Sequence, residues 1–502
     1  MKKIFLAILC LSVVLGGCSI GKKDSNGTPN KDNGNFKVGK VNYKKCSNFL
    51  CASIKVPLDY KKPKGRKIDI ALRTLSAAVP SKRKGIMLIN PGGPGGSGVD
   101  FVQYASSLIS PEILDSFDIV GWDPRGVGQS TKLKCTSANL DYLFDGIDYS
   151  PDNETELTAM LDVNKKVGQD CVNTDKDLAK HLTSIEATRD MDEIRQALNE
   201  KQLNYLGYSY GTVLGQIYAT LFPKNYRTII LDGVVDVGAN PLTSAGDQGI
   251  GFSNAFDSFF NYCKETICKY ANGEDPKTVY SRIASEIDAN PIVSDDGSGS
   301  TLGPAQFDLG TGVYLYGGIE EWPSLDDALS EVELGDSSGI INGYNSYLGR
   351  DYDGTYDGSY MSFLSILCSD GKLASGDDLY SFAKEIGIKA PLIGEAVVLF
   401  GIQCSYWPNV GDAKAFKVNN SKGNSVLVIG TTGDPATPVQ ASRDVAKKLQ
   451  HGSLLEFKGE GHTAYGRTNN CVSETVDKYI LTGVASKKTT YCSKDLLVGS
   501  AI

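Results

Sequence analysis

A serine in the pentapeptide Gly207-Tyr208-Ser209-Tyr210-Gly211 has the setting of a catalytic nucleophile. A short apolar run at 203–206 precedes it and a helix-like run at 212–221 follows it. In a G-x-S-x-G turn between a strand and a helix, the serine adopts strained backbone angles that expose its hydroxyl. A second match to this pattern surrounds Ser337, in an acidic stretch with no strand before it, so we expect Ser337 to be a surface serine.

A serine nucleophile needs a base, and three histidines are available in the whole chain. His462 lies in a Gly-rich turn directly after the strand-like run 453–457, from which an imidazole could reach the carboxyl edge of a sheet. His181 precedes the nucleophile and His451 lies at a polar turn, so we expect both in solvent. In this architecture the order along the chain is Ser, Asp, His, which favours His462 as the base.

The base in turn needs a carboxylate that orients its ring. The strand-like run 425–429 leads into Gly430-Thr431-Thr432-Gly433-Asp434-Pro435, so Asp434 ends the strand before the one that carries His462. An Asp in a Gly/Thr/Pro turn can also simply hydrogen-bond its own backbone. We expect Asp434 to be the acid, with Asp412 and Glu460 as the substitutes.

The loop Asn90-Pro91-Gly92-Gly93-Pro94-Gly95-Gly96-Ser97-Gly98 could supply an oxyanion hole. Its glycines allow the main chain to approach a ligand closely, and the loop directly follows a strand-like run, where the second donor loop of such a site belongs. A phosphate-binding loop is the alternative, but no Gly-Lys-Ser/Thr follows. We expect the amides of Gly93 and Tyr210 to donate to the substrate oxygen.

Strand-like and helix-like runs alternate up to about residue 236, and this rhythm predicts a mostly parallel α/β sheet. The rhythm fails between about 237 and 420 and then resumes. We therefore expect one core, formed by residues 41–236 and 421–502, with an inserted lobe at 237–420. The lobe holds 26 acidic and 10 basic residues, a net charge of −16, which serves solubility or attracts a cationic group such as a peptide N-terminus.

The overall composition is that of a globular protein. Of 502 residues, 41% are hydrophobic and 22% charged, and the net charge is −8. A negative net charge argues against a nucleic-acid partner, which a basic face would recognise.

The first residues predict export. Two lysines precede an apolar run at 4–15 that is too short to span a bilayer, and the run ends in Leu15-Gly16-Gly17-Cys18. This end resembles a bacterial lipobox, so we expect a signal peptide at 1–17, a lipid on Cys18 and a flexible tether at 18–40. An ordinary secretory signal with an incidental cysteine is the alternative, and either one exports the protein.

Export permits disulfides, and ten cysteines remain after Cys10 and Cys18 are set aside. A zinc site is a weaker explanation, because no CxxC spacing occurs. The sequence does not fix the connectivity, but neighbouring cysteines suggest five pairs, namely Cys46 with Cys51, Cys135 with Cys171, Cys263 with Cys268, Cys368 with Cys404, and Cys471 with Cys492.

Taken together, the motifs resemble those of the prolyl and tripeptidyl aminopeptidase branch of the α/β-hydrolases. The residues that carry the resemblance are the Gly92–Gly96 loop, the segment Gly121-Trp122-Asp123-Pro124-Arg125-Gly126-Val127-Gly128-Gln129-Ser130, the serine turn, Gly433-Asp434-Pro435-Ala436-Thr437-Pro438 and Gly461-His462. The likeness is greatest to secreted actinomycete tripeptidyl aminopeptidases and related cell-envelope lipoprotein hydrolases.

The resemblance implies an α/β-hydrolase core with a mainly helical cap, no metal or other cofactor, and release of short peptides from a free N-terminus. Prolyl aminopeptidases have a histidine where this chain has Pro91, which favours the tripeptidyl side. Carboxylates of the cap hold the substrate amine in this family. By position the candidates here are Glu320, Glu321 and Asp370, each of which could instead be a surface acid.

The sequence thus predicts a lipid-anchored serine exopeptidase of the bacterial cell envelope. It would release short peptides, most simply tripeptides, or amino acids from free N-termini. It would touch the membrane only through its anchor and would bind no nucleic acid. A carboxylesterase or other acyl hydrolase with the same triad is the nearest alternative. A lipoprotein that binds peptides without cleaving them is another.

Overall fold

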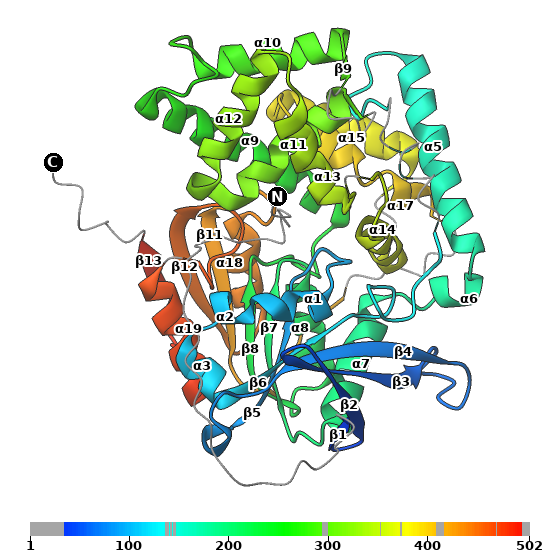
Figure 1. Cartoon of the computed structure of the whole chain (residues 1–502), viewed down its shortest axis with the longest axis vertical. Helices are drawn as coiled ribbons and strands as arrows, with labels where there is room; N and C mark the ends of the chain where they lie inside the picture. Colours follow the sequence, from blue (N-terminus) through cyan, green and yellow to red (C-terminus); the bar gives the residue numbers. More distant parts are fainter. Residues whose placement is uncertain are drawn as a thin grey trace, which may run out of the picture.

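Residues 35–135, 140, 143, 147–293, 300–351, 353–371, 374–407, 416–467 and 469–493 are described by this computed structural model (Figure 1). The expected signal peptide, the expected lipidation site Cys18 and the substitute acid Asp412 lie outside these residues. Among the described residues, no helix has both the length and the apolar character needed to cross a membrane.

A single large sheet organises the core (Figure 1). Its strand order is β1-β2-β3-β4-β6-β5-β7-β8-β11-β12-β13, antiparallel from β1 through β4 to β6 and parallel from β6 onward. The strands are β1 (Asn35–Val38), β2 (Val41–Cys46), β3 (Phe49–Pro57), β4 (Lys67–Leu75), β5 (Gly85–Asn90), β6 (Phe117–Trp122), β7 (Leu203–Tyr208), β8 (Tyr226–Asp232), β11 (Val426–Gly433), β12 (Gly452–Glu460) and β13 (Thr490–Ser493).

The central strands β5, β7 and β8 are buried along almost their whole length, as parallel strands covered by helices on both faces must be. The helices and 3₁₀ turns of the core are η1 (Pro80–Lys82), α1 (Gly98–Phe101), η2 (Val102–Tyr104), α2 (Ala105–Leu108), α3 (Pro111–Ser116), α5 (Glu154–Asn173), α6 (Lys176–Ala179), α7 (Ser184–Ala197), α8 (Gly211–Leu221), α18 (Val439–Lys448) and α19 (Asn470–Thr482). This is the mostly parallel α/β arrangement that the sequence predicted.

The chain between β8 and β11 forms a helical lobe, called the cap below, that covers one end of the sheet in Figure 1. Its helices α9, α10 and α11 each begin with a proline in the first turn, where the missing N–H has no partner to lose. The elements of the cap are α9 (Pro241–Thr266), α10 (Pro276–Ala289), β9 (Ile292–Val293), β10 (Thr301–Leu302), α11 (Pro304–Gly317), η3 (Gly318–Glu320), α12 (Trp322–Glu333), α13 (Ser338–Leu348), α14 (Ser359–Asp370), α15 (Gly376–Lys389), α16 (Gly394–Leu399) and α17 (Gln403–Tyr406).

Much of the cap has a hydrophobic core of its own, rich in aromatic rings. Phe256 packs against Phe260 and Tyr280, with ring centroids 6.0 and 4.9 Å away, and Phe259 lies against Trp322 at 6.2 Å. Such pairs contribute beyond the area they bury. The cap is therefore a packed unit whose position over the sheet is fixed by contacts at its base.

Helix α5 also belongs beside the cap, although it precedes the nucleophile in the chain. It runs along the cap helices in Figure 1, and the α-carbon of its Gly168 packs so closely under Trp407, next to α17, that an added Cβ would lie 3.2 Å from the indole. The sequence alone does not show this position of α5, because an amphipathic helix does not reveal which neighbour its apolar face meets.

The first strand differs from expectation. Residues 35–38, placed in the tether from their composition, pair as β1 with β2 in an antiparallel hairpin. Gly39, at φ 59°, adopts the left-handed conformation that its tight turn requires. A strand at the edge of a sheet can contain polar residues, so the sequence pattern did not predict this one.

Five disulfides are present among the described residues. They join the five neighbouring pairs that the sequence suggested: Cys46–Cys51, Cys135–Cys171, Cys263–Cys268, Cys368–Cys404 and Cys471–Cys492.

Candidate active site

Ser209 occupies a sharp turn between β7 and α8, with a left-handed φ of 53°. A non-glycine residue adopts this conformation only under constraint. The constraint is visible: the Ser209 amide donates to the carbonyl of Asp232 at 2.8 Å, and the Thr212 hydroxyl donates to the Ser209 carbonyl at 2.6 Å. An added Cβ on Gly207 would be 2.5 Å from the Gly211 carbonyl oxygen, and one on Gly211 would be 2.8 Å from the side-chain oxygen of Asn90, so neither position has room for a side chain.

His462 and Asp434 form a buried pair at the ends of β12 and β11. The His462 Nδ1 lies 2.9 Å from each carboxylate oxygen of Asp434, and both side chains are fully buried. The Nε2 of His462 is also buried and has no hydrogen-bond partner among the described residues. This nitrogen is therefore available to an incoming group.

Asp434 is held by more than the imidazole. Its Oδ1 accepts from the amides of Ala436 at 3.0 Å and Thr437 at 2.8 Å. Its Oδ2 accepts from the Thr437 hydroxyl at 2.8 Å and from the Thr463 amide at 3.2 Å. The backbone hydrogen bonds expected of an Asp in such a turn are thus present together with the contact to His462, and the two interpretations of Asp434 are not exclusive.

The end of β8 brings the serine turn and the histidine loop together. The Asp232 carbonyl binds the Ser209 amide, and its carboxylate binds the amides of Ala464 and Tyr465, just beyond His462. A Cβ added to the next residue, Gly233, would lie 3.1 Å from Cε1 of His462. Ser209 and His462 therefore lie on either side of the Asp232-Gly233 segment.

The glycine loop after β5 lies directly against the serine turn. An added Cβ on Gly92 would be 2.9 Å from the Ser209 Cβ and 3.0 Å from the Tyr210 amide nitrogen. In the described part of the chain, the amides of Gly93 and Tyr210, both expected at the oxyanion hole, donate to no protein atom. Two donors on adjoining segments are thus open to a substrate oxygen.

Asp123, in the segment 121–130, braces this glycine loop. Its buried carboxylate accepts from the Ser97 hydroxyl at 2.7 Å, the Val99 amide at 3.1 Å and the Gln129 amide at 2.7 Å. Burial raises the pKa of Asp123, while these three donors oppose the rise. The segment that helped to define the resemblance therefore supports the glycine loop.

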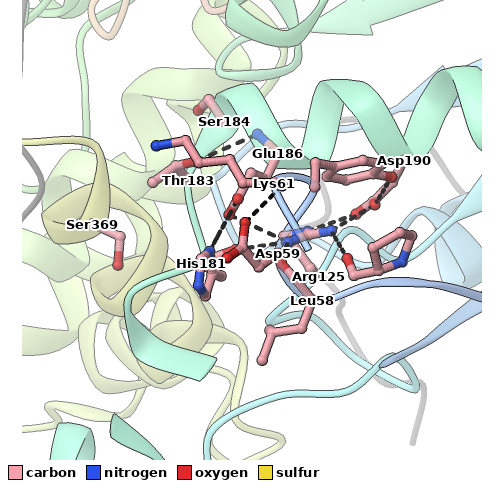
Figure 2. Close-up of polar contacts among 12 residues, drawn as sticks. Leu58, Asp59, Lys61, Arg125, His181, Thr183, Ser184, Glu186, Asp190 and Ser369 are labelled. Atoms are coloured by element: carbon pink, nitrogen blue, oxygen red, sulfur yellow. Dashed lines mark hydrogen bonds and ion pairs between the residues drawn. The ribbon is translucent and has the colours of Figure 1, made fainter. Parts of the chain in front are cut away.

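Arg125, two residues further on, is the centre of the buried polar network drawn in Figure 2. Its guanidinium makes two 2.7 Å hydrogen bonds to Asp190 and donates to the carbonyls of Pro57, Leu58 and His181. A planar guanidinium with five donors suits such a site better than an ammonium would. Arg125 thus ties the end of β3 to α7 and to the loop before α7.

His181 belongs to the same network and differs from expectation. It was expected in solvent, but its ring is only 20% exposed, and its Nδ1 lies 3.0 Å from Oε1 of Glu186 (Figure 2). With Asp59 these two residues are the one described group of His, Cys, Asp or Glu side chains whose ligand atoms lie close enough to share a metal ion, within 4.8 Å of one another. Arg125 already approaches Glu186 to 3.4 Å, so a cation there would face a guanidinium.

Asp370, the last residue of α14 in the cap, reaches into the core. Its carboxylate accepts from the amide of Ser184 at 2.7 Å, from the Ser184 hydroxyl, and from the Tyr210 hydroxyl at 3.4 Å. The Ser184 hydroxyl also contacts that of Tyr210. Burial raises the pKa of Asp370 to about 6. Of the three candidate cap acids, Asp370 is the one tied to the residue after the nucleophile.

Glu320 and Glu321 lie at the base of the cap, where η3 meets the histidine loop. An added Cβ on Gly318 would be 2.6 Å from the carbonyl of Glu460, two residues before His462. Glu320 forms an ion pair with Arg467 at 3.7 Å. Glu321 is half-buried, and burial together with the nearby charge of Glu320 raises its pKa, which Arg467 partly offsets.

The structure also places the second serine, the third histidine and one substitute acid. Ser337 is buried, with 2% exposure, so the expectation of a surface serine is wrong: it occupies the N-cap position of α13, without a side-chain capping hydrogen bond, and packing of the cap covers it. His451 is exposed, as expected. Glu460, a substitute acid, is half-buried, and its Oε1 lies 3.5 Å from the Ser258 hydroxyl, while Asp434 contacts His462.

Two residues of the site were not singled out from the sequence. The first is Asp232, for which a signal existed, since it is an acid at the carboxyl end of an apolar run. The second is Tyr316 of α11, whose ring meets the His462 ring edge-on, with centroids 5.3 Å apart. No local pattern could identify Tyr316, because it comes from the cap.

Comparisons with known proteins agree with this geometry. A family model described as "alpha/beta hydrolase fold" matches residues 85–268, and one described as "TAP-like protein" matches residues 390–492. The serine protease Hip1 of Mycobacterium tuberculosis is 32% identical over 468 residues, covering 88% of this chain and 87% of that protein. The tripeptidyl aminopeptidase of Streptomyces lividans is 26% identical, covering 88% and 83%.

A third relative is named as an esterase rather than as a peptidase. Carboxylesterase B of M. tuberculosis is 31% identical over 518 residues, covering 97% of this chain and 98% of that protein. The expectation drawn from the motifs is confirmed at the level of the family. The chain is an enzyme of the α/β-hydrolase family and belongs to its branch of tripeptidyl aminopeptidases and related serine hydrolases.

Proposed function

We propose that this serine peptidase of the α/β-hydrolase type is an exopeptidase that releases short peptides, tripeptides in the simplest case, from free N-termini. The observation that carries the hydrolytic part of the proposal is the buried Asp434–His462 pair, whose Nε2 has no partner among the described residues, together with Ser209 in its constrained turn. The exopeptidase part is supported by the likeness to a tripeptidyl aminopeptidase. Such a pair prepares a base for one adjacent hydroxyl.

The proposed reaction uses each of these atoms. His462 Nε2 takes the proton of the Ser209 hydroxyl as Oγ attacks the peptide carbonyl, and Asp434 holds the Nδ1–H and stabilises the imidazolium. The amides of Gly93 and Tyr210 bind the oxyanion. His462 then gives its proton to the leaving amine, and a water molecule, activated by the same imidazole, releases the acyl group from Ser209.

Recognition of the free amine is assigned to Glu321. Among the three candidate cap acids, Asp370 already accepts from Ser184 and Tyr210, and Glu320 is paired with Arg467. Glu321 is half-buried and lies next to the turn that contacts the histidine loop, and no salt bridge joins it to a described cation. A protonated peptide N-terminus would supply its missing counter-charge.

The test is a panel of chromogenic amino-, di- and tripeptidyl substrates, each with a free and an acetylated N-terminus, beside a short-chain ester. We expect free tripeptides to have the highest kcat/KM, with acetylation costing about ten- to two-hundredfold, as for the loss of one charge-assisted contact. Glu321→Gln should remove this discrimination, whereas Glu320→Gln, the matched neighbour, should retain it. Equal cleavage of free and blocked peptides would contradict the exopeptidase assignment.

A carboxylesterase is the second candidate, favoured by the carboxylesterase relative that covers nearly the whole chain. Higher kcat/KM for the ester than for every free peptide would support it. Loss of all activity and of fluorophosphonate labelling in Ser209→Ala is expected for both candidates. An unlabelled wild-type protein that still binds peptides would instead indicate a binding lipoprotein.

We also propose that the protein is exported and held in the bacterial cell envelope by a lipid on Cys18. The lipobox-like Leu15-Gly16-Gly17-Cys18 and the five disulfides, a feature of oxidising compartments, support this. Metabolic labelling with a fatty acid should mark the wild type and not Cys18→Ala. Labelling of both would contradict the assignment.

A further inference from the structure

The loop that carries His462 contains a strained residue directly after the histidine. Thr463 has a left-handed φ of 66°, and a β-branched residue in this region is an outlier that the surroundings must enforce. The ring of His462 can keep its place only if this turn is held.

Two buried carboxylates hold the turn through three successive amides. The Thr463 amide donates to Asp434 at 3.2 Å. The Ala464 amide donates to both oxygens of Asp232, at 3.1 and 3.0 Å, and the Tyr465 amide donates to its Oδ2 at 2.7 Å. One of the two carboxylates contacts the imidazole itself, and the other acts only on the loop.

Asp232 is also attached to the nucleophile, since its own carbonyl accepts from the Ser209 amide at 2.8 Å. Its backbone therefore holds the strained Ser209, and its side chain holds Ala464 and Tyr465, the two residues that follow the strained Thr463. Asp232 is completely buried, and no Lys or Arg forms an ion pair with it among the described residues. The only cation that the proposed reaction brings near it is the imidazolium of His462.

We infer that Asp232 is a positioning residue for the hydrolytic reaction, which orients the His462 ring through the Ala464 and Tyr465 amides and adds negative charge beside the imidazolium. This inference rests on the proposed function and goes beyond it, because Asp232 touches neither the imidazole by a hydrogen bond nor the substrate. The Ser-His-Asp site is thus held by two acids with separate tasks.

The charge of Asp232 bears on pH dependence. The titratable groups that face it are His462 and Asp434, from the loops after β12 and β11, and Tyr208 at the end of β7. Burial raises the pKa of Asp232 to about 7, which its two amide donors and His462 partly oppose. A negative neighbour stabilises the imidazolium that forms in the reaction, so removing the charge should change how kcat/KM depends on pH.

The test compares Asp232→Asn with Asp477→Asn. An asparagine must turn an NH₂ group toward an amide that Asp232 accepts from, which would disturb the loop. Asp477 is the matched control, since it supports Tyr465 in the same loop through the tyrosine hydroxyl, at 2.6 Å. We expect kcat to fall about ten- to hundredfold in Asp232→Asn, with KM within about twofold, and to stay near wild type in Asp477→Asn.

A second readout separates positioning from simple loss of structure. The chain has only three histidines, so their imidazole signals can be assigned by ¹⁵N NMR using His181→Gln and His451→Gln. The His462 signals should change in Asp232→Asn, and the acidic limb of the pH profile of kcat/KM should move to lower pH. Asp232→Ser, which keeps one acceptor without charge, should show the same shift if Asp232→Asn does not fold.

An unchanged kcat and an unchanged acidic limb in a folded Asp232 variant would overturn the inference. The proposed function would survive that result as long as Ser209→Ala remains inactive. Residual activity in Ser209→Ala would instead remove the function on which the inference rests.

Discussion

The ring of Tyr316 stands edge-on against the ring of His462, with centroids 5.3 Å apart and planes at 89°. The Tyr316 carbonyl also accepts from the His462 amide at 2.7 Å. Because Tyr316 belongs to α11, these two contacts make the cap a direct support of the base. The cap and the sheet therefore form the site together.

Replacing Tyr316 tests that support. Tyr316→Ala keeps the backbone hydrogen bond and removes the ring, so kcat should fall about two- to tenfold, the value of one aromatic contact. Tyr316→Phe keeps the ring and should have nearly wild-type kcat. Steady-state kinetics on one tripeptidyl substrate measures kcat for both variants. An equal loss of kcat in the two variants would assign the effect to the hydroxyl instead of the ring.

The hydroxyl of Thr437 makes a second testable contact, 2.8 Å from Oδ2 of Asp434. Thr437→Val keeps the shape and removes a hydrogen bond to a charged group, worth about 1.5–3 kcal/mol. We expect kcat/KM to fall about ten- to hundredfold. The control is Thr432→Val, whose exposed hydroxyl donates to the Gly459 carbonyl at 3.2 Å in the same region; a similar loss there would show that the loop responds to any change.

The site residues that lie at the ends of strands could be predicted from the sequence. Ser209, Asp434 and His462 each follow an apolar run that became a parallel strand, and the carboxyl ends of such strands meet at one edge. Local pattern was therefore enough to bring the three together. Gly93 was also predicted in this way, from a glycine-rich loop after a strand-like run that became β5.

Residues that act across the fold could not be found so easily. Tyr316 reaches His462 from the cap, and Asp370 reaches Tyr210 from α14, 160 positions away along the chain. Composition placed Ser337 at the surface, whereas helix packing buries it. For Tyr316 and Asp370 the deciding contact depends on how the cap sits on the sheet, and for Ser337 it depends on how the cap helices pack, neither of which any spacing in the sequence records.

Arg125 should matter for stability more than for chemistry. Arg125→Met leaves Asp190 buried without its counter-charge, and we expect a loss of about 3–5 kcal/mol in the free energy of unfolding. Lys55→Met, which breaks an exposed pair with Asp69, should cost less than about 1 kcal/mol. Denaturant unfolding measures both losses, and the double variant Arg125→Met with Asp190→Leu should recover much of the first; no recovery would show that the carbonyl contacts of Arg125 dominate.

The last prediction concerns Asp370 and pH. Burial raises its pKa from 3.8 to about 6, so between these values the folded protein holds the proton more tightly than the unfolded chain does. The contribution of Asp370 to stability is therefore most favourable below pH 3.8 and is lost as the pH rises to about 6, by up to about 3 kcal/mol. Asp370→Asn cannot ionise and should not share this loss.

Melting temperatures of the wild type and Asp370→Asn, measured from pH 4 to pH 7, isolate the effect, because every other titrating group is common to both proteins. The Tm of the wild type relative to the variant should decrease across this range and level off above pH 6. Asp377→Asn, an exposed acid at the start of α15, should give a constant difference from the wild type. Parallel curves for wild type and Asp370→Asn would contradict this prediction. They would mean that the contacts with Ser184 and Tyr210 keep the Asp370 carboxylate charged throughout this pH range. The cap would then be anchored to the serine turn by a charged carboxylate rather than by a neutral acid.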